Sequence, residues 1–137
     1  MRIMIVDDDL VSRTKMEAIL KTFGTVETVG GGGVALEAFR KAWVAWQPFD
    51  LISLDISMPD MNGAEVLKQI RAVEKEKGID EDKRVKVMMV TGTADRDTVT
   101  TCKQHGCNDY VVKPFTKEVV TAKLRSMGFA PTDSHSS

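Results

Sequence analysis

The sequence carries almost no net charge and has no apolar run long enough to cross a membrane. Its 19 basic and 20 acidic side chains are interspersed and leave a formal net charge of -1. That balance provides no long-range field to attract nucleic acid or an anionic membrane. The first apolar run, residues 1–6, is far too short for a signal peptide or a membrane span, and it ends at Asp7. We therefore expect a cytoplasmic protein with no nucleic-acid partner and no membrane partner.

Cysteine is also scarce, since Cys102 and Cys107 are the two in the chain. With His105 between them they offer three soft ligands for zinc, but a fourth ligand and a second Cys/His pair are missing. A disulfide between them would be unusual in the cytosol. We expect two reduced cysteines, at least one of them buried.

Short β-rich apolar runs alternate with helical patterns along the 137 residues. The predicted strands are residues 2–7, 25–29, 51–55, 85–90 and 109–112. A helical pattern follows each strand, which implies parallel strands joined by right-handed crossovers. The predicted fold is therefore α/β, a flavodoxin-like doubly wound five-stranded parallel sheet of order 2-1-3-4-5 with helices on both faces.

The helical segments differ in how strongly the sequence predicts them. Leu36, Phe39, Trp43 and Trp46 recur at helical spacing, which predicts that both tryptophans anchor a long helix in or near the core. The helix after residue 95, capped by Thr93 or Asp95, is rich in threonine and valine and is expected to be marginal and mobile. The charged run 74–84 predicts a helix end followed by a solvated polar loop. We expect one domain over residues 1–127 and a disordered tail over 128–137.

Reactive side chains stand at the ends of the predicted strands. Asp7 and Asp8 follow the first strand, Asp55 ends the third, Thr91 follows the fourth and Lys113 follows the fifth. Ligands of such sheets bind at the carboxyl ends of the strands, beside the point where strand order reverses. Three neighbouring carboxylates repel one another unless a cation neutralises them, and oxygen ligands suit a hard ion. The sequence therefore predicts a site for Mg²⁺ or Mn²⁺.

These groups form a set suited to phosphoryl transfer. Asp8, Asp55 and the carbonyl of Ser57 would hold the metal, with Asp7 acting through water. Asp55 would keep an oxygen free to attack phosphorus as a nucleophile. The phosphoryl oxygens would be contacted by Lys113, Thr91, Ser57 and the backbone N–H of Gly92.

Residues 1–127 resemble the receiver domain of two-component response regulators, of the stand-alone chemotaxis type. The resemblance rests on Val6-Asp7-Asp8, Asp55 ahead of Met58-Pro59-x-Met61-x-Gly63, Val90-Thr91-Gly92, and Tyr110-Val111-Val112-Lys113-Pro114-Phe115. It implies that Asp55, rather than Asp7 or Asp8, accepts a phosphoryl group with Mg²⁺ present. The donor would be a sensor histidine kinase, a phosphotransfer protein or a small phosphodonor, and the domain would also catalyse its own dephosphorylation.

The same resemblance implies a conformational switch. Thr91 would move toward the phosphoryl group and Tyr110 would turn inward, changing the surface of the fourth helix, fifth strand and fifth helix for a downstream protein target. Ser57 and Thr93 stand where side chains tune the hydrolysis rate in this family. The four glycines at 30–33 and the long charged segment depart from the usual pattern.

Two other functions fit parts of the sequence. A phosphatase of the haloacid dehalogenase type would use Asp7-x-Asp9, with Asp7 as the nucleophile. Gly30-x-Gly32-x-x-Ala35 matches a dinucleotide-binding fingerprint, although it follows the second strand rather than the first. The sequence leaves open the cognate kinase, the output partner, the lifetime of the phosphorylated state, oligomerisation on activation, and whether the chain is a fragment.

Overall fold

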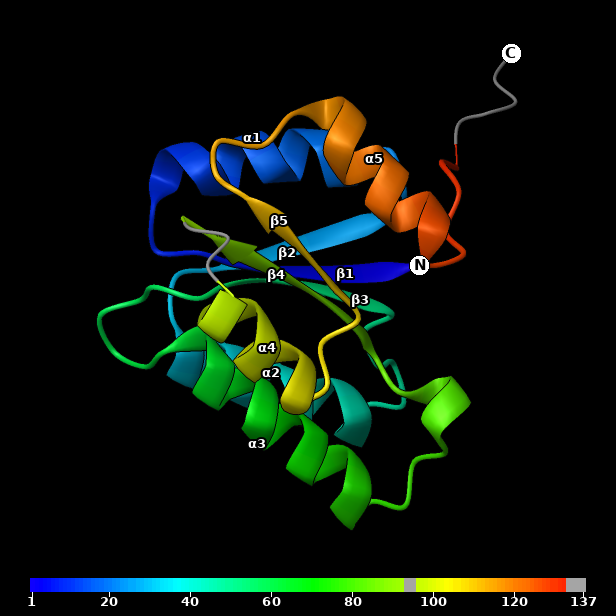
Figure 1. Ribbon diagram of the computed structural model, residues 1–137. Coiled ribbons are helices and arrows are strands. Elements are labelled where there is room, and N and C mark those ends of the chain that lie inside the picture. Colours follow the sequence, from blue (N-terminus) through cyan, green and yellow to red (C-terminus); the bar gives the residue numbers. More distant parts are fainter. Residues whose placement is uncertain (93–95, 133–137) are drawn as a thin grey trace.

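A central parallel sheet lies between two layers of helices in the computed structural model (Figure 1), which describes residues 1–92 and 96–132. The strands are β1 (Arg2–Val6), β2 (Thr25–Val29), β3 (Leu51–Asp55), β4 (Lys86–Thr91) and β5 (Asp109–Val112), in the order β2-β1-β3-β4-β5. The helices are α1 (Leu10–Leu20), α2 (Gly32–Val44), α3 (Gly63–Glu76), α4 (Arg96–Gln104) and α5 (Lys117–Ser126), with a short 3-10 helix, η1 (Glu81–Lys83). The predicted fold class and strand order are confirmed.

Two apolar clusters fill the space between the layers. Ile3 and Ile5 of β1 face α1 and α5, whereas Met4 and Val6 join the cluster beneath α2 and α3. Successive strand residues point to opposite faces, so each strand contributes to both clusters. All of β3 is buried, as expected for the central strand of a parallel sheet. The carboxylate of Asp55 is therefore carried to the rim of the sheet by a fully packed strand.

The predicted role of Trp46 as a core anchor is wrong. Helix α2 ends at Val44, and Trp46 follows with a φ of 58° and an exposed fraction of 84%. The amide of Gln47 bonds the carbonyl of Ala42 there, so the chain has left the helix before Trp46 can continue the buried stripe. Trp43 is half-buried and packs against the core.

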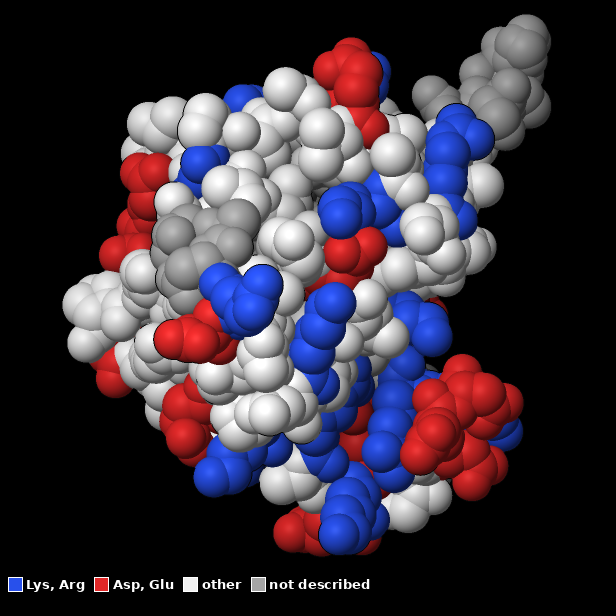
Figure 2. Space-filling view, in the orientation of Figure 1, with Lys and Arg blue, Asp and Glu red and all other residues white. Residues whose placement is uncertain are grey.

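The charged run 74–84 begins with a buried residue, contrary to the prediction of a solvated segment. Glu74 is 0% exposed, and its carboxylate lies 2.6 Å from Nη1 of Arg71 and accepts the backbone N–H of Val85 at 2.8 Å. It thus satisfies the first amide leading into β4. The rest of the run is a helix end and η1, and Figure 2 shows its acidic side chains exposed over η1 beside basic ones of the α3 and α4 region.

The chain ends and caps also bear on the predictions. Phe129 packs against the core cluster beneath α1 and α5, and Thr132 donates from its amide to the carbonyl of Thr22 at 2.8 Å. Residues 128–132 therefore contact the domain, although the prediction assigned them to a disordered tail.

Thr93 and Asp95, the predicted caps of α4, lie outside the described residues, as does the segment 133–137. In the parts of the chain that are described, no helix has the length and apolar character needed to cross a membrane.

Candidate functional site

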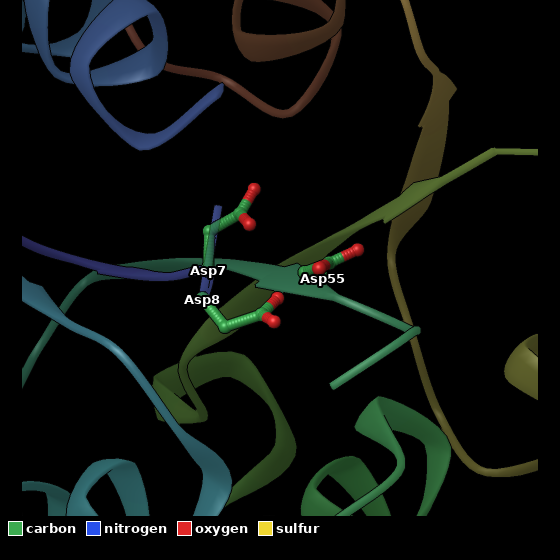
Figure 3. A group of neighbouring side chains, drawn as sticks. All are labelled: Asp7, Asp8 and Asp55. Atoms are coloured by element: carbon green, nitrogen blue, oxygen red, sulfur yellow. The ribbon is translucent and has the colours of Figure 1, made fainter. Parts of the chain in front are cut away.

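Three carboxylates meet where β1 and β3 end (Figure 3). Asp7 and Asp8 directly follow β1, and Asp55 is the last residue of β3. Carboxylate oxygens of the three lie within 4.8 Å of one another, with Asp7 and Asp55 buried and Asp8 exposed. This is the cluster predicted from the strand ends. Oxygen ligands at such separations fit a hard divalent cation, with Asp8 on the open side.

Lys113 reaches this cluster from the end of β5. Its Nζ lies 3.3 Å from Asp7 and 3.5 Å from Asp55. The backbone places it there, because the amide of Lys113 donates to the carbonyl of Thr91 at 2.7 Å and ties the end of β5 to the end of β4. The Lys113–Pro114 peptide bond is cis. The lysine is thus a fixed positive charge beside two buried carboxylates.

The charges at the site do not balance. Burial and the neighbouring Asp7 charge raise the pKa of Asp55 to about 6, and Lys113 offsets only part of that increase. Burial by itself would lower the pKa of Lys113, but the charges of Asp55 and Asp7 outweigh burial and raise it. The excess negative charge is a physical reason for a cation to bind here.

We expect the substitution Asp55→Asn to stabilise the fold at neutral pH. The folded protein holds the Asp55 proton with a pKa of about 6 against an ordinary value of 3.8. Ionised Asp55 therefore costs stability above pH 6, on the order of 2 kcal/mol. Below about pH 3 the carboxyl is neutral in both folded and unfolded states, so the gain should be nearly lost at pH 3.5. Urea unfolding at pH 7.5 and pH 3.5 measures this difference, and an equal gain at both would contradict it.

The loop that follows Asp55 is held at both ends. The amide of Ile56 donates to the carbonyl of Val90, and the amide of Gly63 donates back to the carbonyl of Ile56. Asn62 caps α3 by accepting from Ala64 at 2.7 Å. A Cβ at Gly63 would lie 2.2 Å from the Asp55 carbonyl oxygen, so this position requires glycine. The loop geometry beside Asp55 thus depends on Gly63.

Ser57 lies within this loop, exposed, two residues after Asp55. Its amide donates to a carboxylate oxygen of Asp55 at 3.4 Å. This contact keeps Ser57 beside Asp55, with which it is predicted to hold the metal. Its predicted roles as a metal ligand through its carbonyl, as a phosphoryl contact and as a rate-tuning residue stay predictions.

Asp60 is a contact of this loop that the sequence reasoning missed. Its carboxylate accepts the amides of Gly32 at 3.2 Å and Gly33 at 3.1 Å, at the start of α2, and these bonds lower its pKa. A Cβ at Gly32 would lie 2.7 Å from Val66 and at Gly31 3.1 Å from Asp60, so the glycine run permits a close approach. The amides that a dinucleotide phosphate would use already bind Asp60, which disfavours that function.

The three aspartates after β1 make different contacts. Asp9, not Asp8, caps α1, accepting the hydroxyl of Ser12 at 2.7 Å and its amide at 3.3 Å. Asp7 accepts the amide of Asp9 at 2.9 Å. Asp8 takes part in neither of these bonds and is exposed at the acidic cluster. Arg13, another residue that sequence reasoning missed, donates to the Asp7 carbonyl at 3.2 Å, which no local motif signals.

The comparison with known proteins decides the family. The model of the response regulator receiver domain matches residues 3–125. The chain belongs to this family. It is 34% identical to chemotaxis protein CheY of Pseudomonas aeruginosa over 129 residues, 93% of this chain and 95% of that protein. It is 35% identical to chemotaxis protein CheY-3 of Vibrio cholerae over 126 residues, 90% of this chain and 88% of that protein.

A solved receiver structure agrees. The BeF3-activated receiver domain of DrrB superposes with a TM-score of 0.74 at 27% identity, covering 91% of this chain and 94% of that one. Receiver domains are the phosphorylated modules of two-component signalling, and this receiver shares both their sequence pattern and their fold. The acidic cluster described above occupies the strand ends where receivers bind Mg²⁺.

The remaining predicted residues that the structure describes lie on β4, just after it, and on β5. Thr91 is buried at the end of β4, and Gly92 is exposed, with open space where a side chain would lie. Tyr110 is half-buried, with Lys123 Nζ 5.2 Å from its ring. Thr93 lies outside the described residues. The switch roles of Thr91 and Tyr110 and the rate-tuning role of Thr93 stay predictions.

The cysteine and histidine residues do not form a second metal centre within the described residues. Cys102 is buried, Cys107 is half-buried, and both are free thiols. Burial raises the pKa of Cys102, and burial with the nearby Cys102 and Asp109 raises that of Cys107 to about 11. The cluster Asp7, Asp8 and Asp55 is the one group of potential ligands found in that part of the chain. Thiols whose pKa values are raised stay protonated at neutral pH, and protonated thiols are poor zinc ligands.

Proposed function

We propose that this receiver is a phosphoacceptor switch in which Asp55 takes the phosphoryl group. The observation that carries the proposal is the position of Asp55. It is buried, ends β3, shares a group of oxygens within 4.8 Å with Asp7 and Asp8, and lies 3.5 Å from Lys113. A carboxylate nucleophile, a metal-binding pair and a cation for the transferred group are together at the strand ends.

The chemistry follows from these groups. A carboxylate oxygen of Asp55 attacks phosphorus, the bond from phosphorus to the donor nitrogen or oxygen breaks, and its electron pair stays with the donor. The positive charge of Lys113 would neutralise the phosphoryl oxygens. The hydroxyl of Thr91 and the amide of Gly92 would donate hydrogen bonds to them. Asp8, Asp55 and the Ser57 carbonyl would hold Mg²⁺ or Mn²⁺, and Asp7 would contact it through water. When bound, the metal neutralises the charge that develops on the transferred group.

The pKa of Asp55 adds a condition to this chemistry. Only the ionised carboxyl is a nucleophile, and without a bound cation the pKa of about 6 leaves part of it protonated in mildly acidic solution. A divalent ion bound at Asp8 would favour the ionised form of the Asp55 carboxyl group. Metal would therefore both bind the substrate and activate the acceptor.

We infer that the partners are a sensor histidine kinase or phosphotransfer protein upstream and a protein target downstream. The similarity to the two chemotaxis proteins supports an upstream partner of this kind. The output surface would be formed by α4, β5 and α5, where Tyr110 lies. The expected cytoplasmic location remains a prediction.

The phosphatase alternative is less well supported. It needs Asp9 as a proton donor beside the nucleophile Asp7. Asp9 instead caps α1 through Ser12, and the hydroxyl and amide of Ser12 lower its pKa. A carboxyl group with a lowered pKa is a poor general acid. This contact favours the receiver chemistry at Asp55.

A beryllofluoride titration tests the proposed switch. In Mg²⁺, the phosphoryl mimic should shift the amide resonances of residues 55–57, 91–92 and 109–112 and of α4, with one mimic bound per chain. The variant Asp55→Asn should show none of these shifts, and Asp82→Asn, an exposed change in η1, should show all of them. Shifts absent from the wild-type chain, or retained in Asp55→Asn, would overturn the proposal.

A further inference from the structure

Helix α2 has an exposed face that its own domain does not cover. Three large apolar side chains on this side are solvent-exposed: Val34 at 58%, Val44 at 76% and Trp46 at 84%. Glu37 and Lys41 lie between them and are also exposed. The opposite side of the helix is buried, with Phe39 at its centre and α3 alongside. Exposed apolar groups of this size, framed by charges, indicate a contact surface.

The pattern on this face is symmetric about Phe39. Val34 stands five residues before it and Val44 five after, while Glu37 stands two before and Lys41 two after. A second copy of the helix laid antiparallel, with the two Phe39 positions aligned, would place Val34 on Val44 and Glu37 on Lys41. Each of these contacts would occur twice, because an isologous pair repeats every contact about its twofold axis.

The charges match in this arrangement. Within one chain, Lys41 and Glu37 already form an ion pair at 2.8 Å, with 75% and 66% of their side chains exposed. In the antiparallel pair, each Lys41 would also face the partner's Glu37, giving a network of four alternating charges. Such a network is more favourable than an isolated surface pair, because each ordered side chain serves two contacts. A parallel pair would instead oppose like charges.

The groove along α2 has room for Trp46. It encloses about 500 Å³ and is lined by Gly33, Glu37, Arg40, Lys41, Val44 and Ala45. In the antiparallel register, the segment after Val44 of one copy, which carries Trp46, would reach the Gly33 end of the other helix. Gly33 has no side chain, so the end of the groove is open to an indole ring. The exposed tryptophan and the open end of the groove therefore complement one another.

We propose that α2 mediates a symmetric, antiparallel homodimer of this chain, with Trp46 of each copy over Gly33 of the other. The contact is weak, because a 13-residue helix is about 20 Å long and buries less area than a stable dimer needs. The dimer is independent of the proposed phosphorylation, and it is tested on the unphosphorylated chain.

Sedimentation equilibrium tests the dimer. The average mass should rise from one chain toward two between about 10 µM and about 1 mM, as expected for a helix-sized contact. Val44→Lys and Trp46→Lys should each remain monomeric across this range. Val119→Lys, a change at an exposed apolar residue of α5, should behave like the wild-type chain. A wild-type chain that stays monomeric to 1 mM, or one unaffected by Val44→Lys, would overturn the proposal.

A charge exchange tests the antiparallel register. Glu37→Lys and Lys41→Glu each remove the internal ion pair and should each be monomeric alone. Mixed in equal amounts they should associate, since one face then carries two positive charges and the other two negative charges. The double variant Glu37→Lys/Lys41→Glu should dimerise like the wild-type chain. Circular dichroism checks that all variants keep their helix content. Failure of the mixture to associate would exclude this register.

Discussion

Replacing Asp55 with asparagine is expected to reduce phosphoryl incorporation to background. Asparagine keeps the size of the side chain but has no carboxylate to attack phosphorus, and the covalent route is lost rather than slowed. It also removes one of the three carboxylate charges of the acidic cluster. Incubation with Mg²⁺ and acetyl phosphate, followed by intact-mass analysis, measures the effect.

Two further variants give this result its meaning. Asp82→Asn changes an exposed carboxylate of η1 and should incorporate phosphate like the wild-type chain. Asp7→Asn should slow incorporation but not abolish it, because Asp55 and Lys113 remain. If Asp7→Asn instead abolished incorporation while Asp55→Asn retained it, the nucleophile would be Asp7, as in the phosphatase alternative.

The second large effect is expected at Glu74, far from the site. Replacing it with alanine should lower the free energy of unfolding by about 3 kcal/mol, since removing one partner of a buried ion pair leaves the other uncompensated. The Val85 amide would also lose its acceptor. The expected loss lies at the lower end of the range because Arg71 keeps the carbonyls of Val85 and Gly106 as acceptors.

Urea unfolding gives the value directly. Glu76→Ala, two residues further along α3 and exposed, is the matched control and should change stability by less than about 0.5 kcal/mol. Glu74→Gln should fall between the two, because its amide oxygen still accepts from Val85 while the charge is lost. Equal stability of Glu74→Ala and Glu76→Ala would show that the buried pair contributes nothing net.

The main parts of the site could be predicted because they depend on strand ends. A parallel sheet brings the ends of its strands to one edge. Asp55 ends a recognisable strand, and Asp8 and Lys113 each follow one. The alternation of strands and helices was enough to fix that edge. No contact between distant side chains had to be known in advance.

The features that escaped prediction depend on such contacts. Asp60 binds amides 27 and 28 residues earlier in the chain, and Glu74 binds an amide 11 residues later. Neither partner leaves a periodic signal in the sequence. Trp46 fits the helical spacing, but the backbone leaves the helix at Val44, and periodicity alone does not locate that end.

The most direct test of the proposed function is to locate the phosphoryl group. The wild-type chain should gain one phosphoryl group with acetyl phosphate and Mg²⁺, and borohydride reduction of the acyl phosphate followed by peptide mapping should mark Asp55. Omitting the divalent ion should prevent the gain. A label on Asp7 or on Asp8, or no incorporation with the metal present, would contradict the assignment of Asp55 as the acceptor.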